Sequence, residues 1–195
     1  MTKTIKSLAL TVLFLLPLFI YAQKQERIFL KNRGLKPGSG ENASPVIKKV
    51  LEQCVGKRNI TIVLPGGRLD LWPEGSFSRE LYVSNATEDD SLPKTRNIAF
   101  LFEGSSNIQI EGNNTLVVLH GKMVSFAILN CSNISLRNLA FDMERPTMSE
   151  MTVMSATSDS VLANIHPDSK YSIKDGKLGF YGDGWTTKQY HTILF

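Results

Sequence analysis

The sequence has 195 residues, with 22 basic and 18 acidic side chains and a net charge of +4. This length allows one ordinary domain with its own apolar core. The charged residues are spread along the chain, which excludes the concentrated basic face that nucleic-acid binding requires.

The first 22 residues have the layout of a secretory signal peptide. Lys3 and Lys6 precede an apolar run over residues 8–20, and Ala22 offers a small residue at a plausible cleavage site. The run is short for a membrane span, although a retained N-terminal anchor is the alternative. We therefore expect export to the periplasm or the extracellular space, with no membrane contact after cleavage. Cleavage removes two lysines and no acid, which lowers the net charge from +4 to +2.

Residues 23–40 are polar with Gly and Pro, and indicate a leader into the fold. A short amphipathic helix is then predicted over residues 44–54. Ser44 suits the N-cap and Pro45 the first helical position, while Gly56 suits the left-handed residue that ends a helix. The predicted buried stripe follows the spacing i, i+3, i+4, i+7 at Ile47, Val50, Leu51 and Cys54.

Most of the remaining sequence alternates apolar and polar residues, which is typical of β-strands rather than helices. Turn residues such as Pro65 and Gly66 separate the runs. The strands are predicted over residues 59–64, 68–72, 80–84, 98–102, 107–110, 115–120, 125–129, 133–136 and 139–143.

Two of these stretches repeat each other 26 residues apart: Ser-Asn-Ile-Gln-Ile at 106–110 recurs as Ser-Asn-Ile-Ser-Leu at 132–136. The alignment extends upstream, with Phe100 over Phe126. A fixed period of this size is typical of stacked repeats. We therefore expect an all-β fold made of coils of a parallel β-helix, with the helix covering its open first coil. Two similar strands of an ordinary sandwich are the alternative. The predicted inward residues are Ile108, Ile110, Ile134 and Leu136.

The pattern changes after Pro146. Alternating runs at 171–173 and 178–180 flank Lys-Asp-Gly-Lys, and Asp-Gly at this position indicates a β-hairpin. The predicted organisation is a signal peptide over 1–22, a cap and first coils over 23–146, and an antiparallel β insertion over 147–195. Because an apolar run ends at Phe195 without a partner, we expect the insertion to be truncated.

Asp142 and Glu144 are candidates for substrate contact. Residues i and i+2 of a strand share a face, about 6.5–7 Å apart, which overlaps the carboxyl separation of roughly 6.5–9.5 Å in inverting glycosidases. The competing interpretation is a salt-bridged corner that involves Arg145 or Arg137.

Trp72 and Glu74 place an aromatic ring beside a carboxylate at a turn, an arrangement suited to stacking on a sugar; a core tryptophan is the alternative. Neither the two cysteines nor the three histidines show metal-ligand spacing. Cys54 and Cys131 are interpreted as two buried thiols, with a disulfide as the alternative.

Four motifs then resemble those of the alpha-1,3-galactosidases of glycoside hydrolase family 110, in the same order and at similar spacing. They are Pro-Gly-Gly-Arg-Leu-Asp-Leu-Trp-Pro-Glu-Gly at 65–75, His-Gly-Lys-Met at 120–123, Phe-Asp-Met-Glu-Arg-Pro at 141–146 and Tyr-Gly-Asp-Gly-Trp at 181–185. The resemblance spans residues 28–195. It implies a right-handed parallel β-helix interrupted by small antiparallel β-barrels. It also implies inverting hydrolysis of terminal alpha-1,3-linked galactose, on blood-group-B-type or linear alpha-galactosyl glycans, with no cofactor.

The resemblance also implies that the catalytic acidic residues lie on later coils, so no catalytic residue is assigned within the 195 residues. Asp142, Glu144 and Arg145 match a family motif and remain candidates for substrate binding, together with Trp72 and Glu74. Two alternatives stay open: a non-catalytic carbohydrate-binding or cell-surface β-helix, and a polysaccharide lyase, although the acidic clusters that bind calcium in many lyases are absent.

Overall fold

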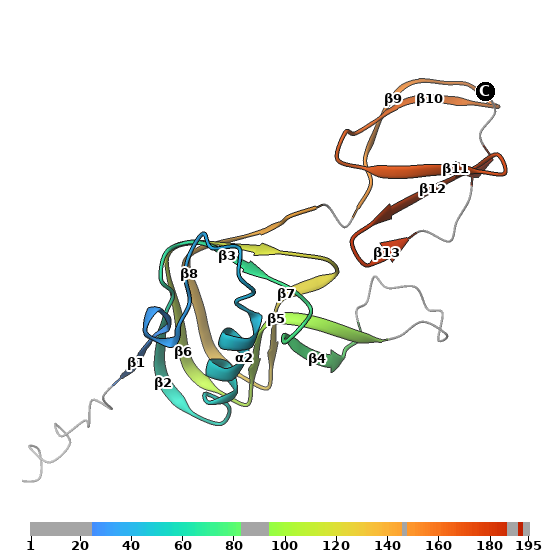
Figure 1. The fold of residues 1–195 in the computed structure, drawn as a ribbon. Helices are drawn as coiled ribbons and strands as arrows, with labels where there is room; N and C mark the ends of the chain where they lie inside the picture. Colours follow the sequence, from blue (N-terminus) through green and yellow to red (C-terminus); the bar gives the residue numbers. More distant parts are fainter. Residues whose placement is uncertain (1–24, 83–93, 146–147, 187–190, 193–195) are drawn as a thin grey trace, which may run out of the picture.

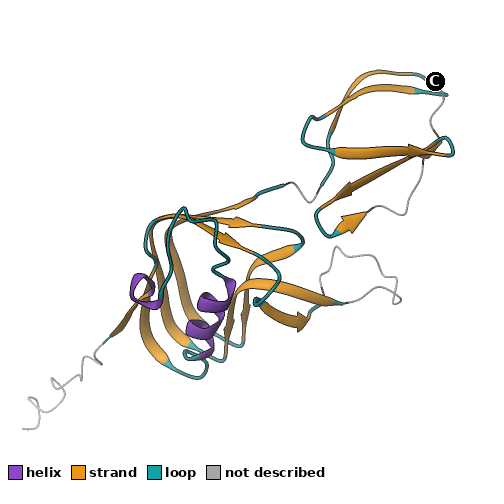
Figure 2. Ribbon diagram, viewed as in Figure 1, coloured by secondary structure: helices purple, strands orange, loops and turns teal. Residues whose placement is uncertain are grey.

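The computed structural model describes residues 25–82, 94–145, 148–186 and 191–192 (Figure 1). Within these ranges the chain is mostly β-strand, with one α-helix and one 3-10 helix (Figure 2). Neither of these helices is both long and apolar enough to cross a membrane. The predicted signal peptide lies outside the described residues.

Among the described residues up to Met143 there are two helices and eight strands. The helices are η2 (Leu30–Arg33) and α2 (Ser44–Glu52). The strands are β1 (Glu26–Phe29), β2 (Arg58–Val63), β3 (Gly67–Leu71), β4 (Phe77–Glu80), β5 (Thr95–Glu103), β6 (Ser106–Leu119), β7 (Met123–Leu129) and β8 (Ser132–Met143).

Parallel pairing dominates this part. Strand β6 pairs with β2 and β3 on one side and with β8 on the other, and β1 extends the sheet beyond β2. A second sheet pairs β5 with β7 in parallel, with β4 antiparallel at its edge. The predicted alignment is confirmed, because Ile108 lies opposite Ile134 and Phe100 opposite Phe126. The sheets are not closed, so the established architecture is a mostly β fold with parallel pairing at the predicted register.

The predicted inward residues belong to the core. Ile108 and Ile110 are 1% and 0% exposed, and Ile134 and Leu136 pack against the same cluster while remaining partly accessible. The residues of β8 are more exposed because, among the described residues, β6 has neighbouring strands on both sides and β8 has one on a single side.

Several strand boundaries differ from the prediction. The separate strands expected at 107–110 and 115–120 are joined in β6, and those at 133–136 and 139–143 are joined in β8. The chain bends at Asn113 and Asn114, whose positive φ angles of 51° and 59° turn the strand while its pairing with β8 resumes at Thr115. The strand predicted at 80–84 is wrong in position over the described residues: β4 spans Phe77–Glu80 with Phe77 buried, and residues 81–82 belong to no strand. Residues 83–84 of that prediction lie outside the described residues.

The leader predicted over residues 23–40 is also wrong in part, since it contains β1 and η2. Leu30 is 1% exposed and belongs to the core. One apolar side chain within a polar segment carries no periodicity, so the sequence pattern could not indicate this element.

Helix α2 packs against β5 and buries the predicted Ile47, Val50 and Leu51; it ends at Glu52, so the buried Cys54 lies just beyond it. Its N-cap is Ala43, not Ser44 as predicted. The Ser44 hydroxyl instead donates to the carbonyl of Trp72 at 2.7 Å, while the Asn42 side chain accepts from the N–H of Ser44 at 2.9 Å. The bond from Ser44 to Trp72 connects the start of α2 to the end of β3. Gly56 does have the expected left-handed φ, +71°, but lies beyond the helix end at Glu52.

A ladder of asparagine side chains runs across β2, β6 and β8. The Asn107 amide donates to the Asn59 side chain at 2.9 Å, and the Asn133 amide donates to the Asn107 side chain at 2.8 Å. All three residues have positive φ, between 53° and 60°. Asparagine tolerates this conformation better than other residues with a Cβ atom, and stacking its amides satisfies one polar group with the next. The ladder therefore holds three successive strands in one register.

Replacing Asn107 with alanine is expected to lower the free energy of unfolding by about 1–3 kcal/mol, because alanine resists this φ and removes both ladder bonds. Asn107→Gly keeps the backbone freedom and loses the amide, so it should cost less. Urea unfolding of the two variants measures the difference. Equal losses for Ala and Gly would show that the backbone conformation contributes nothing.

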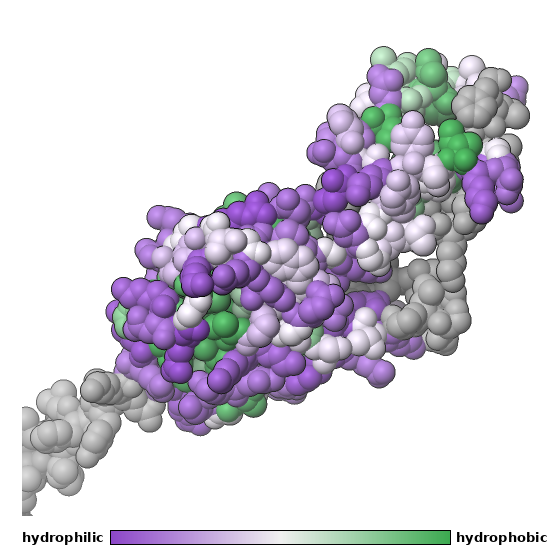
Figure 3. All heavy atoms as spheres, viewed as in Figure 1, coloured by the Kyte–Doolittle hydropathy of each residue, from purple (hydrophilic) through white to green (hydrophobic). Residues whose placement is uncertain are grey.

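The C-terminal part is antiparallel, as predicted for residues after Pro146. Strands β11 and β12 pair with Tyr171 opposite Phe180, and both turn residues, Asp175 and Gly176, have positive φ (52° and 71°), as a type I′ hairpin requires. The exposed apolar side chains of β9 and β10 form part of the hydrophobic surface at that end of the molecule (Figure 3). The strands are β9 (Met151–Ala156), β10 (Val161–Ile165), β11 (Lys170–Lys174), β12 (Lys177–Gly182), β13 (Trp185–Thr186) and β14 (His191–Thr192).

Both cysteines are free thiols; Cys54 is buried as predicted, whereas Cys131 is only partly buried. Ser105 links the two residues: its hydroxyl donates to the carbonyl of Cys54 at 2.9 Å and its N–H donates to Sγ of Cys131 at 3.4 Å. Burial raises the pKa of the Cys54 thiol to about 11, so this thiol stays protonated and unreactive at neutral pH.

Candidate functional site

Parallel pairing brings together the carboxyl ends of β3, β6 and β8. Leu71 lies opposite Leu119, which lies opposite Met143. The next residue of each strand continues the row, because the N–H of His120 donates to the carbonyl of Leu71 at 2.8 Å and the N–H of Glu144 to that of Leu119 at 2.9 Å. Trp72, His120 and Glu144 therefore come from distant parts of the sequence to adjacent positions.

Asp70 is the centre of a polar cluster at this edge. Its side chain is 4% exposed and accepts hydrogen bonds from Nε and Nη2 of Arg68, the latter at 2.6 Å. Nε2 of His120 lies 2.8 Å from the same carboxylate. The Arg68 guanidinium lowers the pKa of Asp70 despite the opposing effect of burial, and the hydrogen bond to His120 acts in the same direction as Arg68. Asp70 is thus an ionised acceptor, so Nε2 of His120 carries the proton.

Arg68 also reaches across to Glu144. Its Nη2 lies 2.7 Å from Oε2 of Glu144, and both side chains are 43% exposed. The two carboxylates together raise the pKa of the Arg68 guanidinium, chiefly through the bond to Asp70. A single arginine therefore bridges a buried and an exposed carboxylate across three strands.

The predicted pair of carboxylates has two different environments. Glu144 forms a salt bridge, as the competing interpretation held, but its partner is Arg68 rather than Arg137 or Arg145. Asp142 is exposed and its side chain accepts from the N–H of Met143 at 2.8 Å. Arg145 donates to the carbonyl of Asp168 at 3.3 Å, which links the strand end to the antiparallel part.

Trp72 stacks on His120, with ring centroids 3.8 Å apart and an interplanar angle of 11°. One face of the indole is therefore covered by protein, so a sugar could stack on the other face alone. Glu74 is exposed, and its carbonyl accepts from the side chain of Asn42 at 2.8 Å. The structure brings Trp72 and Glu144 to one cluster, and Glu74 lies at the turn beyond it.

The sequence pattern does not predict Arg68 or Asp70 as site residues, and it indicates His120 only as part of the motif at 120–123. Ligand atoms of Asp70, His120 and Glu144 lie within 4.8 Å of one another, close enough to hold a cation. Spacing along the sequence could not reveal this group, since Asp70 lies on β3 and His120 and Glu144 directly follow β6 and β8. The Arg68 guanidinium already contacts both carboxylates, so the protein itself supplies the positive charge there.

The fourth motif, at 181–185, lies at the same edge of the sheet as the polar cluster. A Cβ atom built on Gly121 would lie 3.6 Å from Cγ of Pro73 and 3.8 Å from the carbonyl oxygen of Asp183. One built on Gly184 would lie 3.9 Å from the backbone nitrogen of Lys122. Figure 1 shows the turn before β13 beside the start of β7. All four sequence motifs therefore gather where the parallel and antiparallel parts meet.

Comparison with known proteins agrees with this clustering of motifs. Residues 149–195 match the family model described as GLAA-B beta-barrel domain I. Alpha-1,3-galactosidase A of Bacteroides fragilis is 31% identical over 176 residues, which cover 90% of this chain and 29% of that protein. Alpha-1,3-galactosidase B of Bacteroides thetaiotaomicron is 32% identical over 86% of this chain and 27% of its own length.

The chain is a homologue of the alpha-1,3-galactosidases. Alpha-1,3-galactosidase B of Bacteroides fragilis extends the similarity to 99% of this chain, at 30% identity, and 33% of that relative. The resemblance carried by the four motifs is thereby confirmed. The chain spans about a third or less of the length of these relatives.

The depressed pKa of Asp70 predicts an acid-sensitive contribution to stability. A carboxylate whose pKa is lowered in the folded state stabilises the fold when the pH is above its pKa in the unfolded state, about 3.9. This stabilisation is lost as the pH falls through the pKa of the folded state. Asp70→Asn should therefore be less stable than the wild type at pH 7, by about 1–3 kcal/mol. The difference should narrow below about pH 4. Urea unfolding across pH 2–7 measures the stability difference between the wild type and Asp70→Asn. A difference that stayed constant down to pH 2 would contradict the lowered pKa of Asp70.

Proposed function

We propose that this chain forms the N-terminal part of an exported glycoside hydrolase that removes terminal alpha-1,3-linked galactose with inversion, from blood-group-B-type or linear alpha-galactosyl glycans. In this proposal residues 1–22 are a signal peptide. Residues 23–146 build a right-handed parallel β-helix capped by α2, and an inserted β-barrel begins at 147. The homologues named alpha-1,3-galactosidases are the observation that carries the proposal.

The parallel register and the asparagine ladder support the β-helix. From Ser106 to Glu111, strand β6 pairs with residues of β8 that lie 26 positions later in the sequence. The ladder bonds join equivalent positions of three strands. Repeating coils that stack in register produce this pattern, because equivalent residues then lie directly above one another.

The polar cluster is the proposed galactoside contact. Sugar hydroxyls pair well with carboxylates and guanidinium groups, since both make charge-assisted hydrogen bonds. Arg68, Asp142, Glu144 and Arg145 present such groups at the strand ends, and Trp72 adds an indole. The buried Asp70 holds Arg68 in place rather than meeting the sugar itself.

Titration calorimetry with a terminal alpha-1,3-galactosyl disaccharide tests this contact. Arg68→Ala and Glu144→Gln are each expected to weaken binding about tenfold or more, the usual effect of losing a charge-assisted hydrogen bond. Glu103→Gln is the matched control, because Glu103 forms a similarly exposed ion pair with Arg79 at 3.1 Å on another strand. Equal affinity in all three variants would refute the proposed contact.

A non-catalytic carbohydrate-binding protein is the second candidate. The observation in its favour is that both carboxylates of the predicted pair are engaged within the protein, Glu144 by Arg68 and Asp142 by the backbone of Met143. Such groups bind a sugar without the positioned water that inverting hydrolysis requires.

A further inference from the structure

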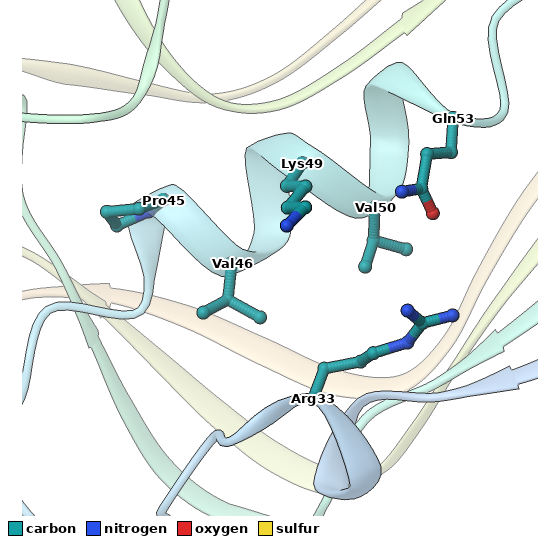
Figure 4. A pocket seen from close by; sticks show the side chains of 6 residues that line it. All are labelled: Arg33, Pro45, Val46, Lys49, Val50 and Gln53. Atoms are coloured by element: carbon teal, nitrogen blue, oxygen red, sulfur yellow. The ribbon is translucent and has the colours of Figure 1, made fainter.

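A hollow of about 250 Å³ lies between α2 and η2, on a different element from the polar cluster (Figure 4). Pro45, Val46 and Val50 give it an apolar wall, and Gln53 adds an amide. Val46 and Val50 are four residues apart and therefore share one side of α2, and Gln53 follows at the C-cap of the helix. The volume is below the range of roughly 300–1,000 Å³ typical of pockets for drug-sized ligands, so the hollow suits a small molecule.

Two cations line this hollow: Arg33 extends from η2 beneath the valines, and Lys49 projects from α2 (Figure 4). Neither side chain forms an ion pair or a side-chain hydrogen bond with any part of the chain that the structure describes. No acidic residue belongs to the lining. Glu52, on the next turn of α2, is not within ion-pair distance of either cation.

Two unpaired cations beside an apolar wall are complementary to an anion that has an apolar face. Arginine binds carboxylates and sulfates through its planar fork, and lysine adds a point charge. A pyranose ring offers C–H groups to an aliphatic wall while its substituent carries the charge. We infer that this hollow is a binding site for an acidic monosaccharide unit, a hexuronate or a sulfated hexose, separate from the proposed galactoside contact.

The choice of a sugar over another small anion rests on the proposed glycan-directed function; the choice of an anion rests on Arg33 and Lys49 alone. A glycan that carries acidic units near its galactose ends could then be held at two places on the same chain. Because the hollow is open to solvent and its attraction is ionic, binding should weaken as ionic strength rises.

Titration calorimetry at low salt tests the inference with methyl glucuronide, galactose 6-sulfate, methyl galactoside and inorganic sulfate. We expect the two acidic sugars to bind and the neutral galactoside to leave this site empty. Arg33→Ala and Lys49→Ala should each weaken acidic-sugar binding about tenfold or more. Lys31→Ala is the control, since Lys31 is exposed on the same helix η2 and does not line the hollow.

Three results would contradict the acidic-sugar site or its sugar specificity. Affinity unchanged by Arg33→Ala and Lys49→Ala, or reduced equally by Lys31→Ala, would overturn the site. If inorganic sulfate bound as tightly as galactose 6-sulfate, the sugar ring would contribute nothing to binding. The inference of a sugar site would then be wrong, and the hollow would be a simple anion site. Failure of the proposed function is separate: it shows as unchanged disaccharide affinity in Arg68→Ala and Glu144→Gln, variants that should not alter acidic-sugar binding.

Discussion

Replacing Phe100 with alanine is expected to lower the free energy of unfolding by about 3–5 kcal/mol, the usual cost of a large cavity in a packed core. Phe100 lies on β5 and is 1% exposed. Its ring also meets Phe141 edge-to-face, with centroids 5.6 Å apart, a geometry that adds a further attraction. The loss should appear in urea unfolding as a lower midpoint at constant slope.

Phe126 is the matched control for this change. It lies directly opposite Phe100 on β7, but it is 46% exposed because no described strand covers its other side. Since about half of the ring already meets water, Phe126→Ala should cost about half as much or less. Equal losses at the two positions would mean that the two strands do not stack as the register indicates.

Purified alone, the 195-residue chain is expected to release no galactose from a terminal alpha-1,3-galactosyl disaccharide at an enzymatic rate. Inverting hydrolysis needs a positioned acid and a positioned base, each typically worth about 10²–10⁴ in rate. The two candidate carboxylates are engaged elsewhere: Glu144 contacts Arg68 at 2.7 Å and Asp142 contacts the N–H of Met143 at 2.8 Å. The hollow described between α2 and η2 borders neither of them.

Detection of free galactose, compared among wild type, Asp142→Asn and Glu144→Gln, checks this expectation. Robust turnover that either substitution abolished would make these two carboxylates the catalytic pair. It would also exclude the non-catalytic candidate. Disaccharide binding without turnover is the expected result, and it agrees with a recognition role for this part of the chain.

Local periodicity was enough to predict several elements from the sequence. The stripe of α2 and the Asp-Gly hairpin of β11 and β12 follow from neighbouring residues, so their patterns are visible without a partner strand. The 26-residue repeat also predicted which strands pair, because equivalent residues of stacked strands keep the same inward positions. The four motifs also pointed to the alpha-1,3-galactosidases, because the order and spacing of motifs can be read from the sequence without a structure.

The polar cluster depended on tertiary structure. Arg68 and Glu144 are 76 residues apart, and Asp70 and His120 are 50 apart. The segment between β3 and β6 breaks the regular offset, so no sequence period aligns these side chains. The competing interpretation of the sequence therefore involved Arg145 or Arg137, whereas the stacking of β3, β6 and β8 brings Glu144 to Arg68. Short-range patterns determine the elements here, and the choice of partners between them is decided by which strand ends the packed sheets bring together.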